Sequence, residues 1–218
     1  MKNKENQLRI NEIFYSIQGE STYAGLPCVF VRLTYCNLRC SYCDTEYAFF
    51  EGNWRDFDDI MTEVKSYNCN LVEVTGGEPL LQENVHPFLQ RLCDEGFEVL
   101  LETGGHMDIS LVDERVRRIV DVKCPTSGES EKVYWENLIH LRATDQVKFV
   151  VGSREDYDFV THIISKYNLS GKCPLLVSPV FGKIELLTLA EWILQDKLPV
   201  RMQLQMHKFI WTPETRGV

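Results

Sequence analysis

The sequence predicts an α/β fold in which parallel strands form a partial, open (β/α) barrel. Apolar runs of strand length alternate along the chain with segments of helical periodicity, and about seven such runs can be counted. Strands that alternate with helices favour parallel pairing through right-handed crossovers. A closed TIM-like barrel takes about 250 residues, so a chain of 218 residues is short for one. A doubly wound sheet is the alternative arrangement.

The expected strands are short runs rich in valine, isoleucine, leucine and phenylalanine. Each run is bounded by charged or turn-forming residues, as strands usually are. Residue 32, an arginine, interrupts the first run with a charge. In chain order the seven strands are expected at 29–33, 71–75, 98–102, 119–123, 146–151, 174–177 and 200–206.

Helices are expected between these strands. The segment 58–67 carries its apolar residues on one side, and the segment 83–95 is followed by Gly96, a residue typical of helix ends. No linker or low-complexity stretch divides the chain, so we expect a single domain over 1–218, with 1–6 disordered. The remaining helices are expected at 111–118, 131–141, 155–167 and 186–195.

The composition limits the class of partner. A net charge of −9 disfavours a polynucleotide ligand, because nucleic-acid surfaces need basic patches. The one basic run, at 115–118, is expected to be a solvated helix face. The polar start at 1–9 is no signal peptide, and no run approaches the ~20 apolar residues of a membrane span. We therefore expect a cytoplasmic protein with reduced cysteines, a small-molecule substrate, and no nucleic-acid or membrane partner.

Three cysteines lie close together in the chain. Cys36, Cys40 and Cys43 form a C-x3-C-x2-C run. Three cysteines on a four-iron cluster would leave one iron open to a ligand that is not protein. A zinc site is an alternative, but structural zinc usually takes four ligands and no H-x3–5-H pair is present. A redox C-x-x-C pair is a second alternative, and it would leave Cys36 idle. The spacing favours a cluster and leaves both alternatives open.

Unusual residues follow the ends of the expected strands, and these ends meet at one edge of a parallel barrel. The cysteine run follows the first strand, and Thr75-Gly76-Gly77-Glu78-Pro79 follows the second. Paired glycines let a ligand approach the backbone closely, although an ordinary turn would look the same. Asp44 and Thr45 offer hard oxygen ligands for Mg²⁺, although helix capping is their commoner role.

Two further features suggest recognition of a polar ligand. Gln18 and Glu20, in a loop before the first strand, offer donors and acceptors that suit an amino-pyrimidinone edge. A plain polar loop is the alternative. Arg32 lies in an apolar strand and needs an anionic partner, supplied by the protein or by a substrate.

Together these motifs resemble those of the radical S-adenosylmethionine (SAM) superfamily and, more narrowly, those of the 7-carboxy-7-deazaguanine synthase family. The resemblance extends over nearly the whole chain. The cysteine and glycine motifs are common to the superfamily. The Gln18-Gly19-Glu20 loop, Thr45 and the Arg-Gly-Val end of the chain narrow the resemblance to the synthase family.

The resemblance implies a lyase of queuosine and 7-deazapurine biosynthesis. Members of that family convert 6-carboxy-5,6,7,8-tetrahydropterin into 7-carboxy-7-deazaguanine and ammonia. A 5′-deoxyadenosyl radical from SAM abstracts hydrogen at C6, and Mg²⁺ assists the ring contraction. The resemblance further implies a flavodoxin or ferredoxin-type electron donor and a homodimer. A glycyl-radical-enzyme activase is the alternative function: it shares the cysteine run but needs neither Mg²⁺ nor pterin-binding residues.

The resemblance also implies roles for individual residues, with no catalytic side chain because SAM supplies the radical. Cys36, Cys40 and Cys43 would hold a [4Fe-4S] cluster, Thr45 would bind Mg²⁺, and the segment 207–218 would close the substrate site. The expected SAM contacts are Tyr42, Cys43, Asp44, Gly77, Glu78, Asp121, Val122, Lys123, Ser178, Pro179, Val180 and Phe181. The expected pterin contacts are Ile17, Gln18, Gly19, Glu20, Arg32, Thr75 and Val218.

Overall fold

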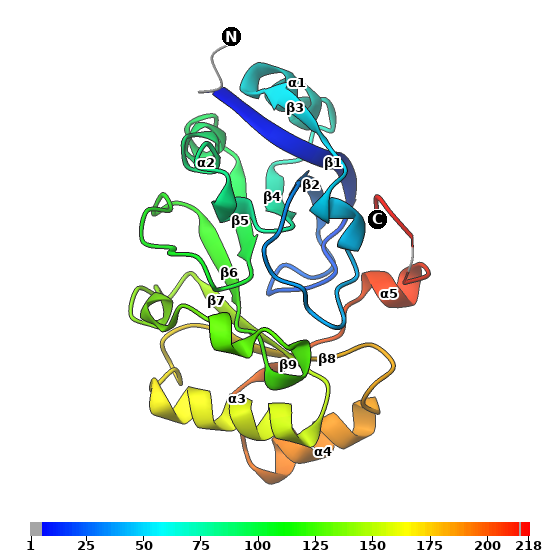
Figure 1. Cartoon of the computed structure of the whole chain (residues 1–218), viewed down its shortest axis with the longest axis vertical. Helices are drawn as coiled ribbons and strands as arrows, with labels where there is room; N and C mark the ends of the chain where they lie inside the picture. The colour runs from blue at the N-terminus through cyan, green and yellow to red at the C-terminus, as the bar shows by residue number, and fades with distance from the viewer. Residues whose placement is uncertain (1–5, 214) are drawn as a thin grey trace.

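The computed structural model describes residues 6–213 and 215–218, so most of the segment predicted to be disordered, 1–6, lies outside the described residues. All nine strands of the described residues belong to one sheet, in the order β3-β1-β2-β4-β5-β6-β7-β8-β9. Neighbours from β2 to β9 are parallel, and the edge strands β3 and β9 do not pair with each other. The predicted open, partial barrel is confirmed (Figure 1).

The seven parallel strands correspond to the seven predicted runs. The last one is much shorter than the predicted 200–206, because only two of its residues pair with the neighbouring strand before the chain leaves the sheet. Their bounds are β2 Pro27–Leu33, β4 Leu71–Gly76, β5 Glu98–Thr103, β6 Arg117–Asp121, β7 Gln146–Val151, β8 Leu175–Pro179 and β9 Arg201–Met202.

Two antiparallel strands at one edge were not predicted. The strand β1, Gln7–Ile17, pairs with β2 on one side and with β3, Asn53–Asp56, on the other. The register of β1 against β2 shifts between Ile10 and Glu12. Such a bulge interrupts the alternation of apolar and polar residues, which is the strand signal in a sequence.

Four helices lie within two residues of predicted ones: α1 Phe57–Ser66, α2 Val85–Asp94, α3 Arg154–Lys166 and α4 Leu186–Gln195. The helices α1, α2 and α3 each bury an apolar stripe, whereas α4 buries only Leu189. In α2 the stripe is Val85, Phe88, Leu89 and Leu92, at the spacing of one helical face. A fifth, short helix, α5 His207–Ile210, was not predicted.

The helix predicted at 111–118 is wrong. Asp113 turns its carboxylate back to accept the backbone N–H of Arg115 at 2.9 Å, and β6 begins at Arg117. Side chains that bond locally to the backbone compete with helix formation in this way. The basic run is therefore not a solvated helix face, and Arg118 is buried.

The helix predicted at 131–141 is also absent, and two short 3-10 turns, Ser130–Lys132 and Trp135–Leu138, take its place. The side-chain amide of Asn137 donates to the carbonyls of Gly105 at 3.1 Å and Met107 at 2.8 Å. These bonds hold the segment against the β5–β6 connection.

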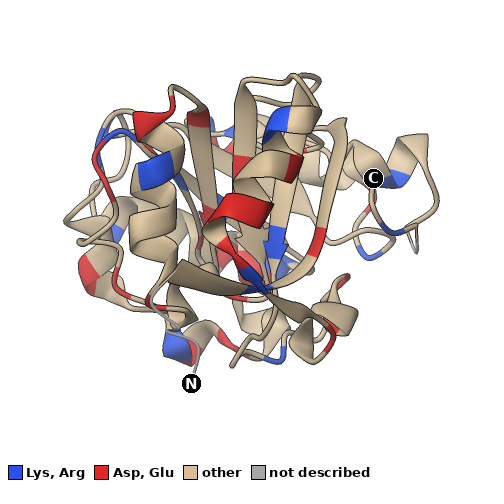
Figure 2. Ribbon diagram, turned by 90° about the horizontal axis from the view of Figure 1, so that it is seen from above, with Lys and Arg blue, Asp and Glu red and all other residues tan. Residues whose placement is uncertain are grey.

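The two faces of the barrel sheet bury different residues. The outer face packs against the helices in one large apolar core. The inner face carries a second, smaller apolar cluster. On several strands a charged residue lies two positions after a residue of this cluster and therefore on the same face of the sheet. Figure 2 shows acidic and basic positions on the strands at the middle of the molecule. The pairs are Phe30 and Arg32, Leu71 and Glu73, Leu100 and Glu102, and Ile119 and Asp121.

Among the described residues, no helix is both long enough and apolar enough to cross a bilayer.

Candidate active site

The cysteine run lies in the loop that follows β2, at the carboxyl edge of the barrel. Cys36, Cys40 and Cys43 are free thiols. Cys36 forms a small apolar cluster with Leu38 and Phe49, and Cys40 and Cys43 pack against this cluster. The N–H of Leu38 lies 3.4 Å from the Cys36 sulfur. Burial raises the pKa of Cys36 and raises that of Cys40 to about 11, so both thiols are weaker acids than an exposed cysteine.

The surroundings of the three cysteines bear on the group that they would hold. Among residues 6–213 and 215–218, no group of three His, Cys, Asp or Glu side chains is arranged to hold a single metal ion. The cysteines of an iron–sulfur cluster bind different irons. Free thiols in one apolar cluster, with an N–H directed at a sulfur, are surroundings in which a three-cysteine cluster fits.

The glycine loop after β4 packs backbone to backbone against the start of the cysteine loop. Gly77 donates its N–H to the carbonyl of Leu33 at 3.1 Å, and Glu78 donates its N–H to the carbonyl of Tyr35 at 2.8 Å. A Cβ on Gly77 would lie 2.2 Å from the Tyr35 oxygen. Gly77 is therefore required by the contact between the two loops, independently of any ligand.

The carboxylate of Glu78 is fully buried and is engaged by the protein. It accepts hydrogen bonds from the hydroxyl of Thr103 at 2.9 Å, the N–H of Gly104 at 2.8 Å and the N–H of Leu80 at 3.0 Å. Burial nevertheless raises its pKa. This side chain joins the β4 and β5 loops, so a cofactor contact at Glu78 would have to use its backbone.

The predicted SAM segment after β6 contributes one ion pair and one core residue. Lys123 Nζ lies 2.8 Å from Asp121 Oδ2, while Val122 is fully buried in the outer core and offers only its backbone. Burial opposes the charge of Lys123, but the Asp121 carboxylate outweighs it and the pKa of Lys123 is raised.

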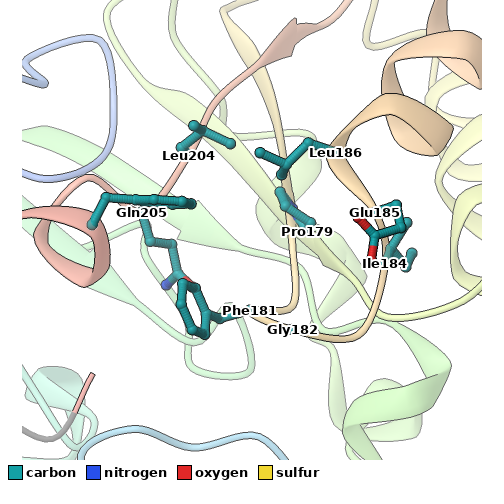
Figure 3. A pocket seen from close by; sticks show the side chains of 9 residues that line it. Pro179, Phe181, Gly182, Ile184, Glu185, Leu186, Leu204 and Gln205 are labelled. Carbon is teal, nitrogen blue, oxygen red and sulfur yellow. The ribbon is translucent and has the colours of Figure 1, made fainter. Parts of the chain in front are cut away.

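The predicted SAM segment after β8 lies across the barrel from the glycine loop. The hydroxyl of Ser178 is buried without a hydrogen-bond partner among the described residues, and Val180 is buried. Pro179 and Phe181 line a cavity of about 180 Å³ (Figure 3). Phe209 also lines this cavity, and its ring contacts the Phe181 ring edge to face at a centroid distance of 5.6 Å.

Tyr42 connects the cysteine loop to the far side of the barrel. Its hydroxyl donates to the carbonyl of Val150 on β7 at 3.4 Å, and burial raises its pKa. The cysteine loop is thus held on two sides, by β4 and by β7.

Lys148 is the centre of a buried charge network on the inner face. Its ammonium group pairs with Glu20, with Glu102 at 2.6 Å and with Asp121 at 3.8 Å. Burial opposes the charge, but the carboxylates outweigh it and the pKa of Lys148 is raised. Lys148 and Glu102 were not predicted, although each is a charge within an apolar strand, the signal that identified Arg32.

The loop 17–20 is fixed from both sides. The amide of Gln18 donates to the buried carboxyl group of Glu73 and accepts the N–H of Glu20 at 2.9 Å. Burial, together with the charge of Glu102, raises the pKa of Glu73 well above its usual range. Gly19 lets α5 pack on this loop, because a Cβ there would lie 2.4 Å from the His207 ring.

Arg32 pairs with a protein carboxylate, one of the two kinds of partner that the sequence allowed. Its Nε donates to Glu12 at 2.8 Å, and its guanidinium lies 5.5 Å from the centre of the Phe14 ring. Glu12 also accepts the hydroxyl of Tyr47 at 2.8 Å. Thr75 is buried one strand away, with its hydroxyl 3.3 Å from Glu102.

Thr45 occupies the N-cap position of a 3-10 turn, Glu46–Phe49, but its side chain makes no capping hydrogen bond. Its hydroxyl lies 3.8 Å from the Cys43 sulfur. The Thr45 side chain therefore does not act as the helix cap that its residue type favours, and its hydroxyl oxygen faces the cysteine loop.

The end of the chain returns to the same edge of the barrel (Figure 1). The guanidinium of Arg216 lies 3.8 Å from the centre of the Tyr47 ring and pairs with Glu51 at 2.9 Å. Val218 makes no ion pair with a described residue through its terminal carboxylate. Three buried or half-buried residues of the segment after β9 reach the site and were not predicted individually from the sequence: Gln205, His207 and Lys208.

Three comparisons bear on this arrangement. The model of the radical SAM superfamily matches residues 31–127. The 7-carboxy-7-deazaguanine synthase of Chlorobaculum tepidum is 49% identical over 217 residues, which cover 98% of this chain and 99% of the relative. That of Koribacter versatilis is 47% identical and covers 97% and 100%. The crystal structure of QueE from Escherichia coli has a TM-score of 0.77 at 20% identity, over 92% of this chain and 95% of that one, a likeness of fold.

Proposed function

This chain belongs to the 7-carboxy-7-deazaguanine synthase family of radical SAM enzymes, and we propose that it converts 6-carboxy-5,6,7,8-tetrahydropterin into 7-carboxy-7-deazaguanine and ammonia. The observation that carries this proposal is a convergence. The cysteine loop, the loop 17–20 and the residues after β9 meet beside one polar inner face, through Asp44, Glu20 and Lys208. A site for a polar, anionic heterocycle next to a radical source needs such a convergence.

We propose that Cys36, Cys40 and Cys43 hold a [4Fe-4S] cluster. When bound, the cluster and SAM supply the 5′-deoxyadenosyl radical that removes hydrogen from C6 of the pterin. The chain's own groups bind and orient SAM from both sides of the barrel mouth. In this proposal they are Tyr42, Cys43, Asp44, Gly77, the Glu78 backbone, Asp121, the Val122 backbone, Lys123, Ser178, Pro179, Val180 and Phe181.

The pterin is proposed to lie on the polar inner face. Burial opposes ionisation of Glu20, but Lys148 outweighs it and lowers the pKa, so Glu20 is a carboxylate that accepts the N–H groups of an amino-pyrimidinone. Arg32 retains its terminal nitrogens for the substrate carboxylate, because its Nε binds Glu12. Ile17, Gln18, Gly19, Thr75 and the terminal carboxylate of Val218 complete the proposed set, with 207–218 closing over the pterin.

Thr45 is proposed to bind Mg²⁺ through the hydroxyl that makes no cap. We further propose a single domain over 1–218, a homodimer, a flavodoxin or ferredoxin-type electron donor and a cytoplasmic location, with no nucleic-acid or membrane partner. These follow from the family and from the sequence composition.

Anaerobic turnover tests the proposed reaction. Reconstituted protein with SAM, dithionite, Mg²⁺ and 6-carboxytetrahydropterin is expected to yield both 5′-deoxyadenosine and 7-carboxy-7-deazaguanine. 5′-Deoxyadenosine without the deazaguanine, from protein with a full iron content, would reject the pterin as substrate. An activase would also leave the pterin unchanged, and it would act on a partner protein instead.

Replacing Thr45 with alanine is expected to lower kcat/KM for the pterin at least about tenfold, because the substitution removes a proposed Mg²⁺ ligand. The response of the rate to added Mg²⁺ is expected to disappear, while iron content stays unchanged. The matched control is Thr62→Ala, in which an exposed hydroxyl on α1 is lost. A Thr45→Ala protein with normal Mg²⁺ dependence would show that Thr45 does not serve the metal.

A further inference from the structure

A continuous series of side-chain contacts crosses the barrel mouth between the predicted pterin loop and the cysteine loop. Gln205 Nε2 donates to Glu20 Oε1 at 2.7 Å, and Lys208 Nζ donates to Gln205 Oε1 at 2.8 Å. Lys208 Nζ also pairs with Asp44 Oδ2 at 2.6 Å. Gln205 and Lys208 together are called the Gln205–Lys208 bridge.

The bridge has only one hydrogen-bonded arrangement. The carboxylate of Glu20 only accepts hydrogen bonds and the ammonium of Lys208 only donates them, so the amide of Gln205 must place its nitrogen toward Glu20 and its oxygen toward Lys208. Gln205 and Lys208 are each 9% exposed. Breaking one contact would leave a buried polar group without its partner, which is costly. The two ends of the bridge are therefore linked energetically.

The segment that carries the bridge rests directly on the pterin loop. Met206 donates its N–H to the carbonyl of Gly19 at 2.9 Å, and the missing side chain of Gly19 leaves room for His207. Gln205 also lines the cavity below the β8–α4 connection (Figure 3). A shift of loop 17–20 must therefore move the bridge, and the bridge contacts Asp44 in the cysteine loop.

We propose that Gln205 and Lys208 are positioning residues that couple pterin binding at Glu20 to SAM binding beside Asp44. This coupling rests on the proposed function. A pterin that fixes the Glu20 carboxylate stabilises the Gln205 amide in its one hydrogen-bonded arrangement, and that arrangement keeps Lys208 on Asp44. By thermodynamic linkage, SAM must favour pterin binding by the same factor.

Calorimetric titration of SAM into anaerobic, reconstituted protein, without reductant, measures this coupling without turnover. In wild-type protein, saturating 6-carboxytetrahydropterin is expected to tighten SAM binding about tenfold, which corresponds to about 1.4 kcal/mol. Gln205→Met keeps a side chain of similar length but removes both hydrogen bonds, and is expected to reduce the effect to less than about twofold. Lys208→Met interrupts the same bridge at its other residue and is expected to give the same loss.

Gln203→Met is the matched control. Gln203 lies on the same segment, is also 9% exposed, and its amide has no hydrogen-bond partner among the described residues. Its replacement is expected to leave the tenfold effect intact. The proposal is overturned if Gln205→Met retains the coupling, or if Gln203→Met loses it equally. A wild-type protein that binds SAM but no pterin would instead overturn the proposed function, and the coupling with it.

Discussion

Replacing Gly77 with alanine is expected to reduce turnover by at least about a hundredfold, because the added carbon has no space between two backbones. The Cβ would lie 2.2 Å from the Tyr35 carbonyl oxygen and 2.9 Å from the Cys36 nitrogen. Backbone atoms cannot swing aside as a flexible side chain does. The cysteine loop must therefore shift at its first cysteine, and a shift of about 1 Å near a reacting centre has an effect of this size. The free energy of unfolding is expected to fall by about 1–3 kcal/mol.

Urea unfolding and anaerobic turnover separate these two effects. The control is Gly171→Ala, at a glycine with a positive φ of 82° and no atom within 4 Å of the added carbon. An alanine at position 171 must adopt a left-handed backbone conformation, which costs about 1–2 kcal/mol, but it displaces no part of the site. It is expected to lose stability and keep its turnover. Full activity in Gly77→Ala would show that the two loops do not depend on this contact.

The parallel strands and most helices could be predicted because burial leaves a periodic pattern in the sequence. The inner polar face could be predicted only in part. Arg32 is recognisable as a charge in an apolar strand, and Glu73, Glu102 and Lys148 carry the same signal. The sequence cannot say which charges meet, because their pairing depends on the register between strands. Arg32 pairs with Glu12, a residue of the strand that the sequence did not predict.

The segment after β9 is the part of the site with no usable sequence signal. The apolar and polar residues of 200–206 alternate as in a strand, yet only Arg201 and Met202 pair in register with β8, and Gln203 adds a single N–H bond to Val177. The remaining residues leave the sheet because tertiary contacts replace the strand pairing, among them the bond from Met206 to Gly19. Such contacts join positions almost 190 residues apart, and local periodicity does not report them.

Replacing Arg118 with methionine is expected to destabilise the fold by about 3–5 kcal/mol, because it leaves a buried carboxylate without its main partner. Arg118 is 3% exposed and Asp145 is fully buried. The guanidinium contacts both oxygens of Asp145, and it also donates to the carbonyls of Ile109 at 2.9 Å and His140 at 2.6 Å. One residue thus joins β6 to both of the irregular connections beside it.

The Arg118–Asp145 ion pair also determines how the free energy of unfolding changes with pH. Burial alone would raise the pKa of Asp145, but hydrogen bonds from Arg118 and Arg142 outweigh it and the pKa is lowered from 3.8. A lowered carboxyl pKa contributes stability that is present above pH 3.8 and is lost as the pH falls through the folded-state value. In Arg118→Met this contribution shrinks, so the difference in unfolding free energy between wild type and variant should narrow in acid. Urea unfolding between pH 7 and pH 3 measures this difference, with Arg201→Met, at an exposed arginine of β9, as the control that is expected to change little. A difference that stays constant over this range would mean that Asp145 does not depend on Arg118 for its charge.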